Sequence, residues 1–354
     1  MTLRVTAQLP ERARRQFWET TPVRTTRRGH FWVPGDRVTR NGHTFQHGPM
    51  YVDWEAPAQV SQPYPVVLVH GGTLQGTEWH DTPDGRPGWA QRFIEAGHAV
   101  LVVDRPCHGR SPYHSEIIGP MGPPFSYERA KQVYLPPGSD VTRWPFDPDD
   151  EAGWDAFIAA YGPIPADLAL SQSMDAHRLA TLLDRIGPAI IITHSASGPV
   201  GWLLADRRSS LVAAIVSVEP MGPAFSQTPG FGPLEWGLTA APVTYDPPRA
   251  TAADARAADP STLRIPALEG LPIAVVTGET SRFVEAAPDI VTFLKTAGAA
   301  AEQLHLPDYG IRGNGHGLIY EKNSDEALAP VLRWLAARQA RERGVINQFD
   351  QGES

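Results

Sequence analysis

The sequence lacks several features that would assign it to a class at once. Its 354 residues include a single cysteine, Cys107, so no disulfide bond can form within the chain. The formal net charge is -8 and no basic run is present, which argues against nucleic acid and anionic membranes as partners. No apolar segment approaches the length of a membrane span. With 42% hydrophobic and 20% charged residues, the composition is that of an ordinary globular protein able to bury a large core.

The sequence also lacks the signatures of secretion, nucleotide binding and metal binding. Residues 1–21 mix arginine and glutamate and contain no apolar stretch typical of a signal peptide, which together with the single cysteine predicts a cytoplasmic location. The glycines at 310, 313 and 315 do not follow directly on an apolar strand, so they form no dinucleotide fingerprint. His43 and His47 lie in a polar turn without a third ligand. We therefore expect no cofactor and no catalytic metal.

Apolar segments and helical patterns alternate through most of the chain. Strands that alternate with helices indicate an α/β protein with a mostly parallel sheet covered by helices on both faces. Residues 29–33 and 49–54, separated by the turn-forming Asn41-Gly42, are expected to pair as an antiparallel hairpin at the start of the sheet. Further strands are predicted at 65–69, 98–103, 190–192, 211–218, 272–279 and 303–306, and helices at 89–96, 173–186, 198–204, 289–297 and 324–341.

Two sections interrupt this pattern with many prolines and aromatic residues. Residues 112–170 show no strand pattern, and residues 221–271 are similarly irregular. Long insertions of this kind are usually functional, so we expect both sections to form a cap over a site. The predicted organisation is an N-terminal arm at 1–28, a core in three parts at 29–111, 171–220 and 272–345, and the two cap sections between those parts.

The clearest functional stretch is Ile190-Ile191-Ile192-Thr193-His194-Ser195-Ala196-Ser197-Gly198. An apolar run ends abruptly in small polar residues and a helical pattern follows, which is the strand–turn–helix layout of a nucleophile elbow. Thr193 and Ser197 stand where the usual G-x-S-x-G motif has glycine. The alternative interpretation is a buried strand followed by an ordinary turn. Functional sites in parallel sheets lie at the carboxyl ends of the strands, however, and Ser195 lies there together with the other candidates.

A serine nucleophile needs a base, and the base needs an acid that orients it. His316 is the best candidate base, because it follows the last predicted strand within a glycine-rich loop. The acid is less certain from the residues alone. Glu219 and Glu279 end successive predicted strands, and Asp308 is a third option.

Backbone N–H groups of two segments are candidates for stabilising an oxyanion. One belongs to Ala196, directly after the candidate nucleophile, and the other to Gly72, in the loop after the strand at 65–69. His70 precedes this loop and is expected to support it. His194 adjoins the candidate nucleophile but is expected to point away from it.

These residues together resemble the α/β-hydrolases, and within them a bacterial esterase group whose elbow reads H-S-x-S-G. The chain order serine, acid, histidine matches this superfamily. The resemblance implies the α/β-hydrolase fold and a Ser–His–Glu triad, and it places the acid at Glu219 rather than at Glu279. It also implies an esterase that is often dimeric. The similarity extends over about residues 28–340 and includes His70-Gly71-Gly72, the T-P-D-G-R-x-G-W run at 82–89, the segment 104–111, Glu219-Pro220 and Gly313-Asn314-Gly315-His316.

The sequence thus predicts a serine hydrolase that cleaves a small-molecule carboxylic ester through an acyl-enzyme. We expect no nucleic acid or membrane partner, and a homodimer is one assembly that the resemblance suggests. The same triad would serve an acyltransferase, a lactonase or an amidase. A ligand-binding protein on the same fold is a further alternative, which the presence of all three triad residues disfavours. The aromatic residues of the irregular sections and the first loop predict an apolar or aromatic substrate, with candidate pocket residues Trp79, Trp144, Phe146, Trp154, Phe225 and Trp236.

Overall fold

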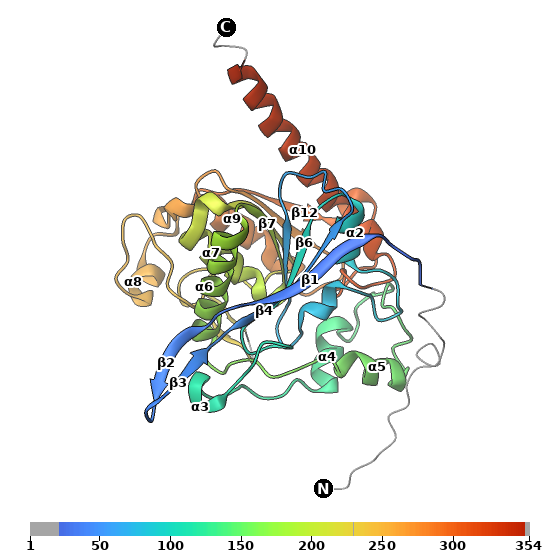
Figure 1. The fold of residues 1–354 in the computed structure, drawn as a ribbon, viewed down its shortest axis with the longest axis horizontal. Helices are drawn as coiled ribbons and strands as arrows, with labels where there is room; N and C mark the ends of the chain where they lie inside the picture. The colour runs from blue at the N-terminus through green and yellow to red at the C-terminus, as the bar shows by residue number, and fades with distance from the viewer. Residues whose placement is uncertain (1–20, 229, 351–354) are drawn as a thin grey trace.

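An eight-stranded sheet forms the centre of the computed structural model, which describes residues 21–228 and 230–350 (Figure 1). Its strand order is β1-β4-β6-β5-β7-β8-β11-β12. Neighbouring strands from β6 to β12 are parallel, and β1 and β4 add an antiparallel edge. This confirms the predicted α/β fold with a mostly parallel sheet. The strands are β1 (Thr26–Val33), β4 (Met50–Pro57), β5 (Val66–Val69), β6 (Val100–Asp104), β7 (Ala189–His194), β8 (Val212–Val218), β11 (Pro272–Thr277) and β12 (Ala300–His305).

The central strands are apolar along their whole length because both faces of the sheet are covered. Every residue of β5 and of β7 is buried. At the far edge, β12 alternates buried with more exposed positions, as expected for a strand that has only one neighbour. The carboxyl ends of β5, β7, β8 and β11 therefore converge at one edge of a rigid sheet, where the candidate site residues follow them.

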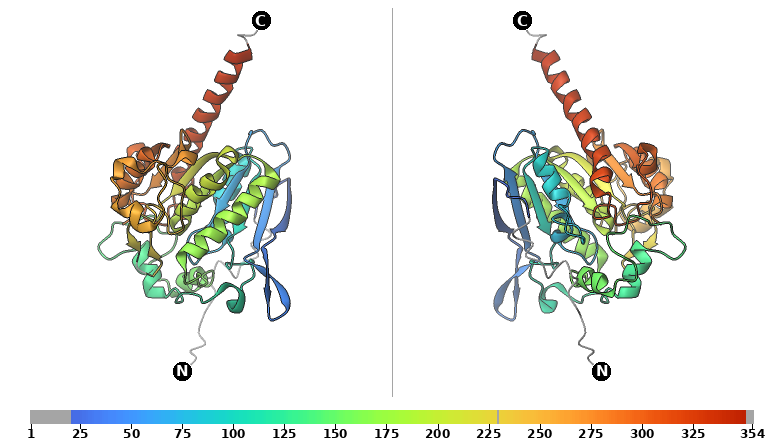
Figure 2. Two further views of the ribbon diagram at one scale, coloured as in Figure 1. Left: turned by 90° about the vertical axis from the view of Figure 1, so that its left-hand side faces the viewer. Right: turned by 90° about the vertical axis from the view of Figure 1, so that its right-hand side faces the viewer.

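Helices cover both faces of the sheet (Figure 2). α6 (Leu168–Ile186), α7 (Gly198–Arg208) and α9 (Ala287–Thr296) contribute their apolar residues to one core layer. α2 (Trp89–Glu95) and α10 (Ser324–Asp350) contribute theirs to the layer on the other face. All five helices were predicted from the sequence, and the prediction of α6 rested on the helical spacing of its apolar residues.

Three of these helices, α6, α7 and α10, extend at least four residues beyond their predicted ranges, and α7 continues to Arg208. α6 begins five residues earlier, because the Asp167 side chain accepts a hydrogen bond from the Leu170 backbone N–H at 2.9 Å and caps the helix start. α10 continues to Asp350, and its last turns project away from the sheet (Figure 1). Although α10 spans 27 residues, no helix within residues 21–228 and 230–350 combines such length with the apolar character that crossing a membrane requires.

The N-terminal part of the described chain forms two antiparallel pairs. β1 pairs with β4 as predicted, and β1 begins at Thr26, within the predicted arm. Residues 1–20 of that arm lie outside the described residues. A separate ribbon, β2 (Asp36–Arg40) and β3 (His43–His47), lies between them and turns at Asn41-Gly42, where φ is 51° and 78°. These positive φ angles are typical of a tight hairpin turn and explain the choice of Asn-Gly.

The two irregular sections contain short elements only. Residues 112–170 hold α3 (Ser115–Ile118), α4 (Tyr127–Tyr134) and α5 (Glu151–Ile158). Residues 221–271 hold α8 (Ala252–Ala257) and a small hairpin of β9 (Gln227–Thr228) and β10 (Gly232–Pro233), which the sequence pattern did not predict. The 3-10 helices are η2 (Gly76–Trp79), η3 (Ser195–Ser197), η4 (Ser209–Leu211), η5 (Pro260–Thr262), η6 (Pro266–Leu268), η7 (Val284–Ala286) and η8 (Leu306–Tyr309).

Aromatic side chains fix the first irregular section to the body of the protein. Trp144 and Trp154 are 2% and 1% exposed and stack with their ring centroids 5.2 Å apart. Phe146 packs edge-on against both, and Tyr134 of α4 packs against Trp144. These rings belong to the same core layer as α2 and α10. The section is therefore anchored through a packed aromatic cluster.

Replacing one ring of this cluster should destabilise the whole fold. We expect Trp154→Ala to lower the free energy of unfolding by about 3–5 kcal/mol, because it leaves a cavity among the stacked rings. Trp32→Ala is the control, since Trp32 is 47% exposed on an edge strand, and its cost should stay below about 1 kcal/mol. Urea unfolding followed by circular dichroism measures both. Equal losses in the two variants would contradict the anchoring role of the cluster.

Candidate active site

Ser195 occupies the sharp turn between β7 and α7. Its φ is +56°, a conformation that costs free energy in a non-glycine residue and that places Oγ at the edge of the sheet. The Ser197 hydroxyl accepts a hydrogen bond from the His194 N–H and lies 3.0 Å from the Val69 carbonyl, to which it donates. A serine at this position of the motif therefore connects the turn to the neighbouring strand β5.

Glycine is required where the turn approaches its neighbours most closely. A Cβ atom on Gly198 would lie 2.6 Å from the Cβ of Pro220, closer than atoms can approach. A Cβ atom on Gly71 would lie 3.3 Å from the Cβ of Ser195. The loop after β5 and the segment after β8 thus pack directly against the turn.

His316 reaches Ser195 from the glycine-rich loop after β12. Its Nε2 lies 2.9 Å from the Ser195 Oγ, within hydrogen-bond distance for proton transfer from the hydroxyl. The imidazole is 2% exposed, and the Phe283 ring stacks on it with centroids 4.2 Å apart. Tyr134 packs against it as well, at 5.6 Å. The ring is held between aromatic side chains from two different segments.

Glu219 lies on the other side of the same imidazole. Its Oε2 is 3.5 Å from the His316 Nδ1, and Nδ1 has no hydrogen-bond partner among the described residues. The carboxylate is completely buried and follows β8 at a φ of +50°. It accepts hydrogen bonds from the Gly278 N–H at 2.6 Å and from the Ser281 hydroxyl. These two donors fix the carboxylate in a position from which it can orient the imidazole.

Burial influences the protonation of both groups. It raises the pKa of Glu219 to about 7, although the hydrogen bonds from Ser281 and Gly278 oppose this rise. It lowers the pKa of His316 well below its usual range, and nearby positive charges add to that effect. A neutral imidazole is therefore favoured at rest, as a general base requires. A proton that it accepts would be stabilised by the adjacent carboxylate.

The two other acid candidates lie away from the base. Glu279 forms an ion pair with Arg312 at 2.5 Å and accepts the Gly313 N–H, and its side chain is 30% exposed. Glu279 therefore fixes the backbone of the glycine-rich loop on the side that faces solvent. Asp308 is an exposed residue of η8. Of the three candidates, only Glu219 is brought to the His316 ring.

The two candidate oxyanion positions are adjacent in space. A Cβ atom on Gly72 would lie 3.1 Å from the Cβ of Ala196. The Gly72 N–H donates to no acceptor among the residues that the structure describes. The Phe231 ring covers this glycine, since the same Cβ would lie 2.4 Å from a ring atom. Sequence reasoning missed Phe231, because nothing in its short hairpin indicates that it returns to the loop after β5.

A cluster of buried apolar side chains, called the apolar wall below, includes Ala196, the residue after the candidate nucleophile. It is formed by Leu168, Ala196, Met221, Leu234 and Ala240, with Ala169 and Phe231 packed against it. Leu168 is the first residue of α6, at the end of the first irregular section, and Phe231 belongs to the second section. The start of α6 and the second section therefore pack together beside Ala196.

The structure does not bring the predicted aromatic pocket residues together around Ser195. Trp79 is fully buried between Trp89 and His194. Trp144, Phe146 and Trp154 belong to the anchoring cluster described above.

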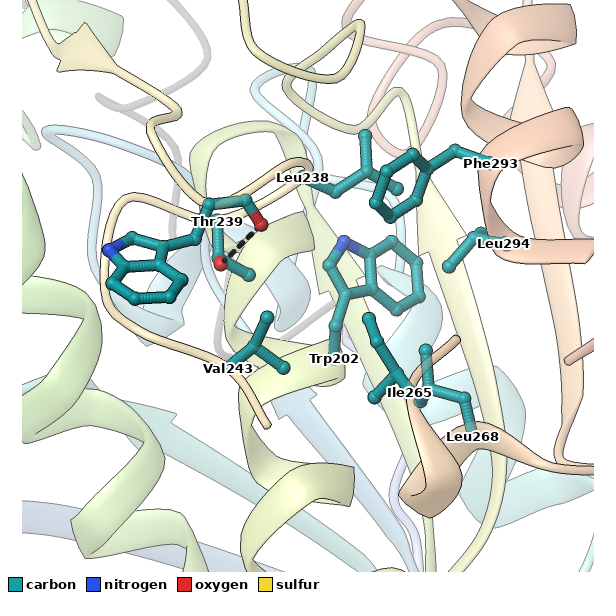
Figure 3. Close-up of a pocket in the computed structure, with 9 residues that line it drawn as sticks. Trp202, Leu238, Thr239, Val243, Ile265, Leu268, Phe293 and Leu294 are labelled. Carbon is teal, nitrogen blue, oxygen red and sulfur yellow. Dashed lines mark hydrogen bonds between the residues drawn. The ribbon is translucent and has the colours of Figure 1, made fainter. Parts of the chain in front are cut away.

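The last two predicted pocket residues lie in the core layer behind α7. Trp236 lines a small apolar cavity together with Trp202 and Phe293 (Figure 3). Phe225 packs against Phe293, with ring centroids 6.4 Å apart. Both side chains therefore pack in the core layer that includes α7 and do not line the space in front of Ser195.

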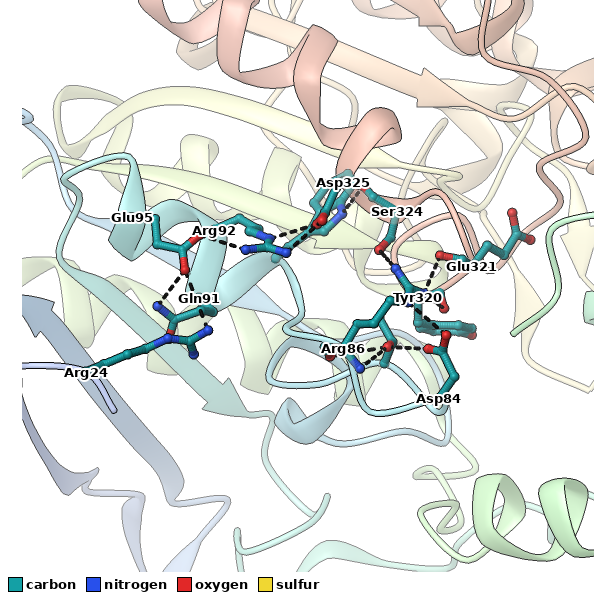
Figure 4. A network of polar contacts seen from close by, with 12 residues as sticks. Arg24, Asp84, Arg86, Gln91, Arg92, Glu95, Tyr320, Glu321, Ser324 and Asp325 are labelled. Atoms are coloured by element: carbon teal, nitrogen blue, oxygen red, sulfur yellow. Dashed lines mark hydrogen bonds and ion pairs between the residues drawn. The ribbon is translucent and has the colours of Figure 1, made fainter. Parts of the chain in front are cut away.

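The T-P-D-G-R run holds the loop of the candidate base (Figure 4). Arg86 is oriented by Asp84 at 2.8 Å and donates to the Glu321 carbonyl at 2.9 Å and to the Ser324 hydroxyl at 3.2 Å. The Trp89 indole N–H donates to the Ser324 carbonyl at 3.0 Å. This run therefore connects the first loop of the core to the start of α10, directly after the loop that carries the candidate base.

Among the described residues, no three His, Cys, Asp or Glu side chains are grouped as metal ligands.

Comparisons with known proteins identify relatives of this chain. The family model described as "Alpha/beta hydrolase family" matches residues 66–331. A curated protein named "Probable secreted lipase phiG", from Fungal sp. (strain ATCC 74256), is 34% identical over 322 residues, which cover 83% of this chain and 87% of that protein. A solved structure described as a novel bacterial esterase has a TM-score of 0.67 at 21% identity and covers 90% of this chain and 98% of its own.

These comparisons correct one expectation. The cytoplasmic location predicted from the N-terminal residues and the single cysteine is contradicted, because the curated relative is named a secreted protein. Composition near a terminus and cysteine count are weak indicators of compartment, since a secreted protein needs no disulfide when its core is large.

Removing the Arg86 contacts should loosen the base loop. We expect Arg86→Ala to lower the free energy of unfolding by about 1–3 kcal/mol, because it removes the guanidinium donors to the Glu321 carbonyl and the Ser324 hydroxyl and breaks the ion pair with Asp84. Arg92→Ala, which removes an exposed ion pair with Asp325 on α10, should cost less than about 1 kcal/mol. Chemical unfolding of both variants makes the comparison. A larger loss in Arg92→Ala would contradict the role assigned to Arg86.

Proposed function

We propose that this chain, which belongs to the alpha/beta hydrolase family, hydrolyses a carboxylic ester with Ser195 as its nucleophile. The observation that carries the proposal is the 2.9 Å contact between the Ser195 Oγ and the His316 Nε2, at the carboxyl end of the sheet. A curated relative named as a lipase supports ester hydrolysis as the reaction class. Its name also supports a secreted enzyme rather than a cytoplasmic one.

The tetrahedral intermediate that leads to the acyl-enzyme would form in one proton-coupled step. The Ser195 Oγ attacks the ester carbonyl carbon while its proton passes to the His316 Nε2. The Glu219 carboxylate stabilises the imidazolium and keeps Nε2 directed at the serine. The 3.5 Å distance from this carboxylate to Nδ1 would shorten when the ring becomes charged, as is common on substrate binding.

Backbone N–H groups would hold the negative charge that develops on the carbonyl oxygen. Those of Gly72 and Ala196 lie on adjacent segments, and the N–H of Gly72 is available among the described residues. Collapse of the tetrahedral intermediate releases the alcohol, which takes the proton from His316. Water then attacks the acyl group of Ser195 by the same route, and the carboxylic acid leaves.

The apolar wall beside Ala196 would bind an apolar part of the substrate. Leu168, Met221 and Leu234 offer no charged or polar group to a ligand there. Phe231 closes this wall over Gly72 and would limit the size of the group that lies along it. We propose that the sections 112–170 and 221–271 form the cap of the site through these residues.

The triad is tested by hydrolysis of a panel of p-nitrophenyl esters. Ser195→Ala should lower kcat on the order of 10⁴–10⁶-fold, and Glu219→Gln roughly 10²–10⁴-fold. Glu279→Gln is the matched control, because it removes an acid that pairs with Arg312, and its kcat should stay within about fivefold of the wild type. Equal activity of the wild type and Ser195→Ala would overturn the proposal.

The size limit is tested with esters of increasing acyl length. Phe231→Ala should raise kcat/KM for long acyl chains relative to short ones by roughly tenfold or more, because the ring no longer closes the apolar wall. Phe225→Ala removes a phenyl ring from the same section but from behind α7, and it should leave the ratio unchanged. An unaltered ratio in a folded Phe231→Ala variant would show that Phe231 sets no size limit.

A further inference from the structure

A second buried acid–imidazole pair lies directly beneath the candidate triad. The Glu78 Oε2 is 3.3 Å from the His194 Nδ1, and the two side chains are 1% and 0% exposed. Glu78 belongs to η2 and His194 is the last residue of β7. The mechanism proposed above uses neither residue. Burying two ionisable groups is costly, so their presence at this point requires a reason.

The contacts of this pair reach three of the segments that carry the candidate machinery. The Glu78 Oε1 accepts the Gly71 N–H at 2.9 Å, next to the oxyanion position Gly72. The His194 Nε2 lies 3.2 Å from the His316 carbonyl oxygen, and the two imidazole rings stack with centroids 4.9 Å apart. His194 itself directly precedes Ser195. One carboxylate and one imidazole thus connect the oxyanion loop, the nucleophile turn and the base loop.

The hydrogen-bond partners indicate how the His194 ring is protonated. A carbonyl oxygen can only accept, so Nε2 must carry a proton. Nδ1 faces a carboxylate oxygen, so a proton is needed between those atoms too. A doubly protonated His194, which donates from Nε2 to the His316 carbonyl and from Nδ1 to the Glu78 side chain, satisfies both contacts of the ring.

A neighbouring histidine shows the opposite arrangement. The His70 Nδ1 lies 2.8 Å from the Gly71 carbonyl oxygen, whereas its Nε2 accepts the Arg105 N–H at 3.0 Å. One nitrogen donates and the other accepts, so the neutral ring satisfies this site. Burial lowers the pKa of His70 well below its usual range, and the positive Arg105 lowers it further.

We propose that Glu78 is a positioning residue that, through His194 and Gly71, fixes the oxyanion loop, the nucleophile turn and the base loop relative to one another. This inference rests on the proposed hydrolase function. Neither residue touches the reacting atoms. The pair acts by holding backbone segments and by placing a positive charge beneath the His316 ring.

That charge gives the pair a measurable electrostatic consequence. Burial lowers the pKa of His194, but the Glu78 carboxylate, the His316 carbonyl and Glu219 together outweigh this effect, and the pKa is raised overall. The positive His194 in turn lowers the pKa of His316, in addition to burial.

The other groups that face His316 are Glu219 and Ser195, the Tyr134 ring of α4 and, on the loop after β11, Arg282. The other groups that face the pair are Tyr134, Tyr161, Tyr320 and Glu219.

Glu78→Gln tests the proposal through kinetics and pH dependence. The variant should lower kcat about tenfold or more with little change in KM, because displaced oxyanion donors weaken transition-state binding. It should also leave His194 neutral, so the pKa of His316 rises. Activity needs the neutral base, and the acid limb of kcat/KM should therefore move to higher pH, on the order of one unit.

Asp175→Asn is the matched control. Asp175 is another fully buried carboxylate, but it pairs with Arg105 at 2.8 Å and does not contact His194. It should lower stability without moving the acid limb. A Glu78→Gln variant whose kcat and acid limb both coincide with those of the wild type would overturn the proposal.

A second measurement uses the unmutated chain, in case Glu78→Gln does not fold. Histidine-selective ¹⁵N labelling and NMR should show one buried imidazole that keeps both ring protons at a pH where exposed histidines have lost theirs. His194→Asn assigns this signal by removing it. Absence of such a ring would overturn the proposal. Because this readout needs no turnover, it stays informative even if the wild type hydrolyses no ester and the proposed function itself fails.

Discussion

Ser195 adopts a left-handed backbone conformation, with φ of +56°, at the point where β7 stops and α7 begins. Such a conformation persists only when the surroundings leave no alternative. Here the surroundings include two glycines at close contacts, Gly71 in the loop after β5 and Gly198 at the start of α7. The Ser197 hydroxyl also donates a hydrogen bond to the neighbouring strand β5. The chain after β8 also contributes, because the Met221 N–H donates to the Ser195 carbonyl. The sheet, the loop after β5 and the segment that carries Glu219 therefore all contact this turn and hold its conformation.

Buried carboxylates organise the loops around that turn, and each is satisfied by donors. Glu219 accepts the Gly278 N–H and the Ser281 hydroxyl, and Glu321 accepts the Gly315 N–H. Glu78 accepts the Gly71 N–H. Burial raises the pKa of Glu321 to about 8 and that of Glu219 to about 7, because both carboxylates are removed from solvent. Loops built of glycine gain a defined shape from these acceptors.

The irregular sections have two physical roles. The aromatic cluster around Trp144 and Trp154 anchors the first section, so that it can hold Tyr134 against the His316 ring. The second section returns to the nucleophile through Phe231 and Met221. Large rings thus serve mainly as anchors. The surface beside Ala196 is built from smaller apolar side chains and one phenyl ring.

Much of the fold and part of the site could be predicted from local sequence. Strands such as β5 and β7 are continuous apolar runs, and helices such as α9 repeat their apolar residues with the helical period, so each element is encoded in adjacent residues. The small residues around Ser195 are encoded in the same way. The choice of Glu219 as the acid needed a family resemblance, because Glu279 also follows a strand.

Only the tertiary structure decided which side chains meet. Glu78 and His194 are 116 positions apart and become neighbours because β5 lies beside β7 in the sheet. Phe231 covers Gly72 because the hairpin of β9 and β10, whose strands have two residues each, folds back over the loop after β5. Composition indicated aromatic residues near the site. It could not separate the rings that anchor the irregular sections from side chains that would line the substrate site, since both kinds are equally apolar. The sequence by itself determined the elements and the nucleophile turn, whereas strand order and loop packing determined the environment of that turn, because contacts between distant segments leave no local pattern.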